Sequence, residues 1–249
     1  DIESIFTGFD YGIVAQGSDD FNKITILTTQ FNANDYGIYL SGVNNAKILN
    51  NSFIIGKNSN NFVSNPVGLY LQNSSGFRIE ENLFAYNPSI TLPRTGLVVK
   101  NSGKDNNQIY NNIFENLTNG QIFDGLNYST KYPYEGLVSL CNINSDNKDN
   151  DFWVRKIEGY NFNGINQFQG EVFDNGSIMN IIAAGNKFSS ISSVNYQYNN
   201  EANPIFYLHY PYNTEELINY SSLNTIFPEI ASENPCPSKI NALNIQTIE

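Results

Sequence analysis

The chain has 249 residues, and its 40% of hydrophobic residues excludes a disordered tail and is ample for a continuous core. Its 42 asparagines favour turns and left-handed backbone positions, so we expect no long helices. The net charge of −11 makes nucleic acid and anionic membranes poor partners, because both attract clustered lysine and arginine. No apolar run is long enough to span a bilayer.

Two short motifs alternate along the first half of the chain. The first is a glycine followed by a strand-like apolar run, and it occurs at residues 11–14, 36–40, 68–71, 96–99 and 136–140. The second has the pattern Ile-x-x-Asn-x-Phe, and it occurs at residues 48–53, 79–84 and 109–114, with a looser match at 24–31. The glycines are 25, 31, 28 and 40 residues apart, and such a period with variable insertions indicates a solenoid.

These motifs predict an all-β fold, a right-handed parallel β-helix. Strands of three to five residues are unstable alone, but stacked coils pair each strand with its equivalents above and below. The repeated Ile, Leu, Val and Phe positions then form the core. We predict that Asn51, Asn82 and Asn112 form a hydrogen-bonded ladder at a sharp corner, rather than serving as ordinary loop residues.

The pattern Gly-Ile/Leu-x-Leu followed by Ile-x-x-Asn-x-Phe, over roughly residues 8–140, resembles the parallel β-helix repeats of secreted bacterial proteins. Residues 136–142, 184–188, 203–207 and 234–237 resemble the tail of large surface β-helix proteins of Bacteroidetes, which are typically type IX secretion cargo. The resemblance implies an extracellular or outer-surface location, the export machinery as a partner, and a sorting domain after the last Cys-Pro. The start at Asp1, without a leader, suggests a mature form or a fragment.

We divide the chain into β-helix coils over residues 1–140 and a continuous second region over residues 141–249, made of further irregular coils and a C-terminal cap. Residues 205–210 form its best strand. If the protein is exported, Cys141 and Cys236 can form a disulfide that ties the start of the second region to its end. Two buried free thiols are the alternative.

Catalytic and metal-binding groups are sparse. The chain has one histidine, His209, so the usual triads and zinc sites lack residues. Asp146, Asp149 and Asp151 are the one calcium candidate, but their spacing is not that of a calcium loop and favours a solvated turn. We therefore expect no cofactor. Arg78 and Glu80 are interpreted as a surface ion pair.

The function expected from these features is that of a secreted or cell-surface module without catalysis, which serves adhesion, binds glycans or proteins, or acts as a structural stalk. Loops 56–66 and 117–135 would face the partner. The aromatic candidates for glycan contact are Tyr128, Tyr132, Tyr134, Tyr207, Tyr210 and Tyr212. The alternative is a polysaccharide lyase or glycoside hydrolase on the same scaffold, which would require three or more carboxylates to converge in a groove.

Overall fold

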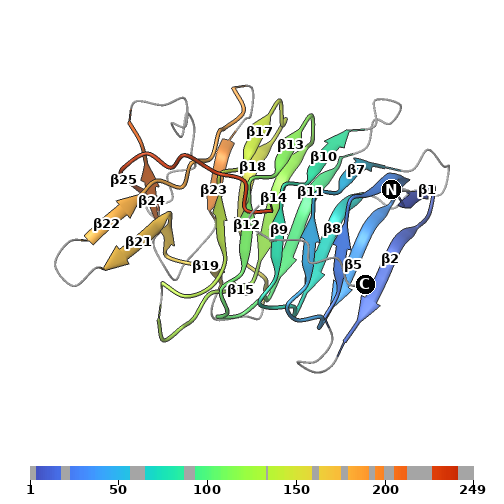
Figure 1. Ribbon diagram of the computed structural model, residues 1–249, viewed down its shortest axis with the longest axis horizontal. Helices are drawn as coiled ribbons and strands as arrows, with labels where there is room; N and C mark the ends of the chain where they lie inside the picture. The colour runs from blue at the N-terminus through green and yellow to red at the C-terminus, as the bar shows by residue number, and fades with distance from the viewer. Residues whose placement is uncertain are drawn as a thin grey trace.

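The structure is a computed structural model that describes residues 4–17, 23–56, 65–86, 93–132, 134–158, 163–174, 179–190, 194–198, 205–211 and 226–240. Within these ranges every element is a β-strand, and three parallel sheets wrap around one elongated core (Figure 1). Each turn of the chain adds one strand to each sheet. The predicted right-handed parallel β-helix is confirmed.

We name the three sheets A, B and C. Sheet A contains β1 (Ser4–Thr7), β4 (Thr29–Asn34), β7 (Ser52–Ile55), β10 (Leu83–Tyr86), β13 (Ile113–Glu115) and β17 (Ile143–Ser145). Sheet B contains β2 (Tyr11–Gln16), β5 (Tyr36–Ser41), β8 (Val67–Gln72), β11 (Thr95–Lys100), β14 (Asn119–Asp124), β18 (Asn150–Arg155) and β23 (Val194–Tyr198). Sheet C contains β3 (Thr25–Leu27), β6 (Lys47–Leu49), β9 (Arg78–Glu80), β12 (Gln108–Tyr110) and β16 (Val138–Leu140).

The phenylalanine of the second motif forms a stacked column inside sheet A. The strand register places one ring from each of five coils at the same position, Phe6, Phe31, Phe53, Phe84 and Phe114. Neighbouring ring centroids are 5.3, 4.8, 4.7 and 4.8 Å apart, with interplanar angles of 9° or less. This column fills the corner between sheets A and B with aromatic surface that is removed from water.

The glycine of the first motif makes room for this column. A Cβ atom on Gly68 would lie 2.8 Å from the ring of Phe84, one coil further on, and equally close to a backbone oxygen. Gly37 and Gly96 stand in the same relation to Phe53 and Phe114, at 2.7 Å. The two motifs therefore recur together because the ring of one coil occupies the space that the glycine of the preceding coil leaves free.

The fifth glycine motif was assigned to the wrong sheet. We aligned residues 136–140 with the sheet B strands, but β16 pairs with β12 in sheet C. The fifth sheet B strand is β14, and its glycine is Gly120. Gly120 faces Asn144, which replaces phenylalanine in the next coil, so the repeat continues there with altered residues.

The predicted asparagine ladder is confirmed and is longer than we expected. The backbone N–H of Asn51 donates to the Oδ1 of Asn82, and Asn82 donates in the same way to Asn112, each at 2.9 Å. The series continues from Asn112 to Asn142 at 2.9 Å and from Asn142 to Asn186 at 2.8 Å. All five side chains are buried, so the ladder satisfies polar groups that would otherwise be costly at the corner.

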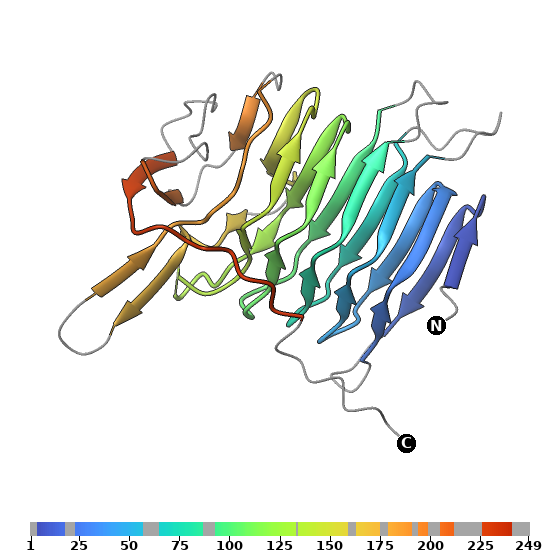
Figure 2. The same ribbon diagram turned by 45° about the horizontal axis from the view of Figure 1, so that its top comes forward.

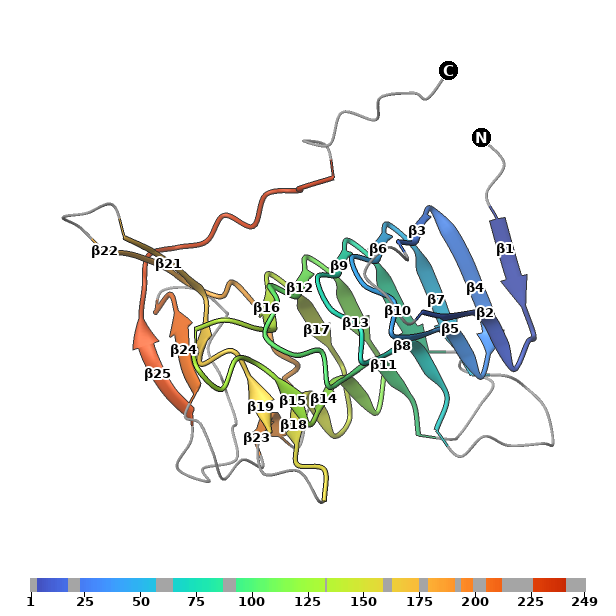
Figure 3. The same cartoon turned by 90° about the horizontal axis from the view of Figure 1, so that it is seen from below.

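The two ends of the stack differ. At the N-terminal end, β1, β2 and β3 are the outermost strands of their sheets in the described part of the chain. The other end carries smaller sheets, formed by β15 (Leu126–Asn127) with β19 (Gly164–Ile165), by β20 (Phe168–Gln169), β24 (Ile205–His209) and β25 (Ile226–Ile230), and by the antiparallel pair β21 (Glu171–Asp174) and β22 (Met179–Ile182). From β25, residues 231–240 return along the outside of the coils (Figures 2 and 3).

Candidate functional site

The candidate site is the turn between β15 and β16, in which the structure describes residues 127–132 and 134–137. The turn folds back on itself through a bridge between Tyr128 and Gly136, and the backbone N–H of Ser129 donates to the carbonyl of Glu135 at 3.1 Å. Gly136 has a φ of 125°, and a Cβ there would lie 2.5 Å from the backbone of Tyr128. A glycine is therefore required for this turn to close.

Two tyrosine rings project from the tip of this turn. Tyr132 is 38% exposed and Tyr134 is 60% exposed, with ring centroids 6.0 Å apart and planes tilted by 42°. The backbone N–H of Tyr132 donates to Ser129 Oγ at 3.0 Å, and the carbonyl of Tyr134 accepts a hydrogen bond of 2.8 Å from Asn166. The first bond closes the turn on itself, and the second ties the backbone of Tyr134 to a residue outside the turn.

A polar pocket of about 260 Å³ lies beside the turn, lined by Lys104, Asp105, Asn106 and Glu135. Glu135 belongs to the tyrosine turn, and the other three residues come from the corresponding turn of the preceding coil. Coil stacking holds the two turns together, because the backbone N–H of Gly103 donates to the carbonyl of Leu126 at 3.1 Å. The pocket brings together two carboxylates, an ammonium group and an amide, and its Glu135 directly follows the exposed Tyr134 in the chain. We call the four pocket residues and the two exposed tyrosines the tyrosine-turn site.

The chemistry of the tyrosine-turn site suits a polyhydroxylated ligand. Carboxylates accept hydrogen bonds from hydroxyl groups, while lysine and asparagine side chains donate to hydroxyl oxygens. The faces of tyrosine rings carry partial negative charge and pack against weakly positive C–H groups. A sugar ring presents both kinds of group. Sequence reasoning singled out Tyr132 and Tyr134 but missed the pocket, because its walls are about 30 residues apart in the chain and only stacking brings them together.

The other predicted aromatic contacts do not belong to this site. Tyr128 is 2% exposed and Tyr207 is 1% exposed, so both are core residues whose rings cannot meet a ligand. Burial raises the pKa of the Tyr128 hydroxyl, and the Tyr207 hydroxyl accepts a hydrogen bond from Asn186. Tyr210 is half-buried and packs against the small cluster around Leu208. Tyr212 lies outside the described residues.

Two residues of the calcium candidate lie in different environments. Asp146 is exposed, whereas Asp151 is fully buried and accepts hydrogen bonds from Asn147 at 2.9 Å and from the hydroxyl of Ser189 at 2.7 Å. Asp151 therefore connects two coils within the core. Over the described ranges, no three His, Cys, Asp or Glu side chains are grouped in a way that could hold a metal ion.

The interpretation of Arg78 and Glu80 as a surface ion pair was wrong for Glu80. The Glu80 side chain is fully buried, and its two oxygens each lie 2.7 Å from the Arg78 guanidinium. This bidentate hydrogen bonding raises the pKa of Arg78 above its ordinary value. Glu80 is buried because its place in the sheet C register lies between Leu49 and Tyr110.

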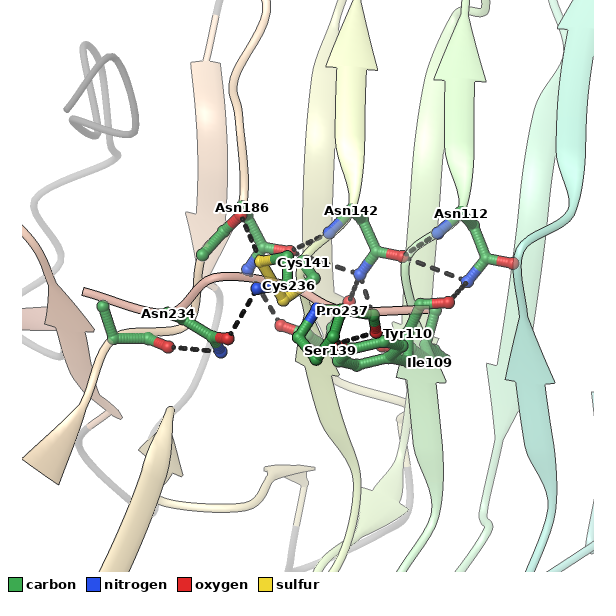
Figure 4. The surroundings of a disulfide bond; sticks show 12 residues. Ile109, Tyr110, Asn112, Ser139, Cys141, Asn142, Asn186, Asn234, Cys236 and Pro237 are labelled. Atoms are coloured by element: carbon green, nitrogen blue, oxygen red, sulfur yellow. Dashed lines mark hydrogen bonds between the residues drawn. A yellow bond between two sulfur atoms is a disulfide. The ribbon is translucent and has the colours of Figure 1, made fainter. Parts of the chain in front are cut away.

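A disulfide joins Cys141 to Cys236, as we predicted, with Cα atoms 5.5 Å apart (Figure 4). Cys141 lies directly before Asn142 of the asparagine ladder, and Cys236 lies in the segment that returns along the coils. The bond spans 95 residues of sequence. It therefore fastens the chain's last described segment to the coil that contains β16 and β17.

Comparison with known proteins agrees with the architecture. The family model described as "Right handed beta helix region" matches residues 1–138. The chain belongs to this family of right-handed β-helix proteins. No curated protein and no solved structure gives a significant match. Among the described residues, no helix could cross a membrane.

Proposed function

We propose that this protein is a rigid, non-catalytic module that binds a glycan through the tyrosine-turn site and serves attachment at the cell surface or outside the cell. The observation that carries the proposal is that two exposed tyrosine rings lie in the turn whose Glu135 lines a pocket of mixed hydrogen-bonding groups. Ligand sites commonly combine aromatic surface with a few convergent polar groups. Both turns of the site are anchored to stacked coils, so ligand binding costs little ordering of the protein.

Two features support an extracellular location. The Cys141–Cys236 disulfide is of the kind that persists in oxidising compartments. The motifs also resemble those of large Bacteroidetes surface proteins, so type IX export and contact with that export machinery are part of the proposal. In this setting the solenoid carries the tyrosine-turn site on a stiff support.

Removing the two rings tests the proposed function. The double variant Tyr132→Ala/Tyr134→Ala should weaken binding to immobilised oligosaccharides of glucose, mannose or galactose by about tenfold or more, because stacking on both rings is lost. Binding can be measured by surface plasmon resonance after an array has identified the best oligosaccharide. Both side chains are exposed, so the thermal unfolding temperature should stay close to that of the unmodified protein.

A matched control is Tyr11→Ala, which removes an exposed tyrosine from the first coil, far along the stack from the tyrosine turn. This variant should bind the oligosaccharide like the unmodified protein. If no oligosaccharide binds, or if the Tyr11 variant loses as much affinity as the double variant, the proposal is wrong. A spacer role for the solenoid would then be the better explanation.

A further inference from the structure

The segment at residues 231–240, which we call the strap, crosses the outside of several coils. It starts at the small C-terminal sheet, where the backbone N–H of Ala231 donates to the carbonyl of His209 at 2.9 Å. Ser232 exchanges backbone hydrogen bonds with β22 and the residue that follows it, and Asn234 donates to the carbonyl of Ala183 at 3.0 Å. The strap then passes over the coils toward the N-terminal end of the stack (Figures 2 and 4).

Three successive coils hold the strap. Cys236 is bonded to Cys141 in one coil, and the Tyr110 hydroxyl of the preceding coil donates to the carbonyl of Pro237 at 2.9 Å. In the coil before that, one carboxylate oxygen of Glu81 accepts from the hydroxyl of Ser238 at 2.6 Å and from the backbone N–H of Lys239 at 3.1 Å. The ammonium group of Lys239 also lies 3.8 Å from the centre of the Tyr110 ring, within the range of a cation–π contact.

The strap is bound at a turn position that repeats from coil to coil. Asn50, Glu81, Asn111 and Cys141 occupy the same left-handed turn position in successive coils, with φ values between 52° and 58°. Gly185 follows in the next coil, and a Cβ on it would lie 2.5 Å from Cys236 Sγ and 3.1 Å from Cys141 Sγ. Any larger residue at position 185 would therefore push the strap away from the coils.

The coil at Cys141 has the same backbone pairing as its neighbours. The backbone N–H of Cys141 donates to the carbonyl of Ala184 at 2.7 Å, as that of Asn111 donates to Leu140 at 3.1 Å. The backbone of Cys141 therefore pairs with the next coil in the same way as that of Asn111, and this hydrogen bond does not involve the sulfur. The sulfur, bonded to Cys236, attaches the strap to this coil.

We propose that the strap is a redox-controlled closure, which locks the small C-terminal sheet onto finished coils when the protein reaches an oxidising compartment. In the reduced protein the coils form with both thiols free and the strap opens readily. On oxidation, Cys141 and Cys236 lose two electrons and two protons to a disulfide oxidant, which is reduced to two thiols as the Sγ–Sγ bond forms. The closed strap then fixes β24 and β25 against the coils.

Hydrogen exchange followed by mass spectrometry on the full chain tests this closure. After reduction with a phosphine, or in the Cys236→Ser variant, amides of residues 205–209 and 226–240 should exchange about tenfold faster or more, because only noncovalent contacts then oppose local opening of the strap. The strand residues 29–34, 36–41, 67–72 and 95–100, in coils that the disulfide does not touch, should keep their protection. Mapping of alkylated thiols in the same samples confirms the redox state.

Two results would overturn the proposal. If the strap exchanges equally slowly in both states, its noncovalent contacts hold it and the thiols control nothing. If all coils lose protection or Cys236→Ser fails to fold, the disulfide is a requirement of the whole fold and not a closure. Glu81→Gln, with the disulfide intact, should speed exchange only at residues 238–240. Glu115→Gln, a partly exposed carboxylate on sheet A, is the matched control and should change nothing there.

Discussion

Asn112 shows how one residue joins three coils. Its side-chain oxygen accepts two hydrogen bonds from Asn82, each at 2.9 Å, while its backbone and side-chain N–H groups donate to Asn142 at 2.9 and 3.0 Å. Its side chain also donates to the carbonyl of Ile79 in the preceding coil at 2.9 Å. The whole group is buried, so each of these partners depends on Asn112 for its hydrogen bond.

The variant Asn112→Ala should lower the free energy of unfolding by about 2–3 kcal/mol, because several buried donors and acceptors lose their partner at once. Urea denaturation followed by circular dichroism measures the change. Asn106→Ala, at an exposed position, should alter stability by less than about 0.5 kcal/mol. An equally small loss for Asn112→Ala would mean that the ladder contributes little to stability.

The strands of sheets A and B pack together through the match between each sheet B glycine and the sheet A phenylalanine of the next coil. Gly68 lies in β8 of sheet B and Phe84 in β10 of sheet A, yet the ring fills the space above the glycine. Both motifs were visible in the sequence, but their interdependence was not. It arises from the turn between the two sheets, which periodicity alone does not specify.

The variant Gly68→Ala should destabilise the protein by about 2–3 kcal/mol, because the added methyl group overlaps the Phe84 ring and a backbone oxygen. Combining it with Phe84→Leu should recover part of this loss, since leucine removes the ring contact but not the backbone one. A double-mutant cycle of unfolding free energies measures this coupling. Strict additivity of the two changes would contradict the proposed fit between the motifs.

For the whole molecule, the sequence was sufficient to predict the solenoid, the ladder at its corner and the disulfide. The prediction failed where the repeat changes its residues. Gly120 was overlooked because Gln121 follows it in place of the Ile or Leu of the motif. Gly136 was misread because Leu137 follows it as the motif requires, although this glycine serves the turn at Tyr128. Buried Tyr128 and Tyr207 could not be distinguished from exposed Tyr132 and Tyr134, because their exposure depends on how the turns stack.

The central claim is that a glycan binds at the tyrosine-turn site, and ligand titration followed by NMR tests it most directly. With ring-labelled tyrosine and the oligosaccharide chosen on the array, the account predicts that the signals of Tyr132 and Tyr134 shift with a common dissociation constant. The signals of Tyr11, Tyr39 and Tyr70, on sheet B, should stay in place. Shifts confined to those sheet B tyrosines, with Tyr132 and Tyr134 unmoved, would contradict the account.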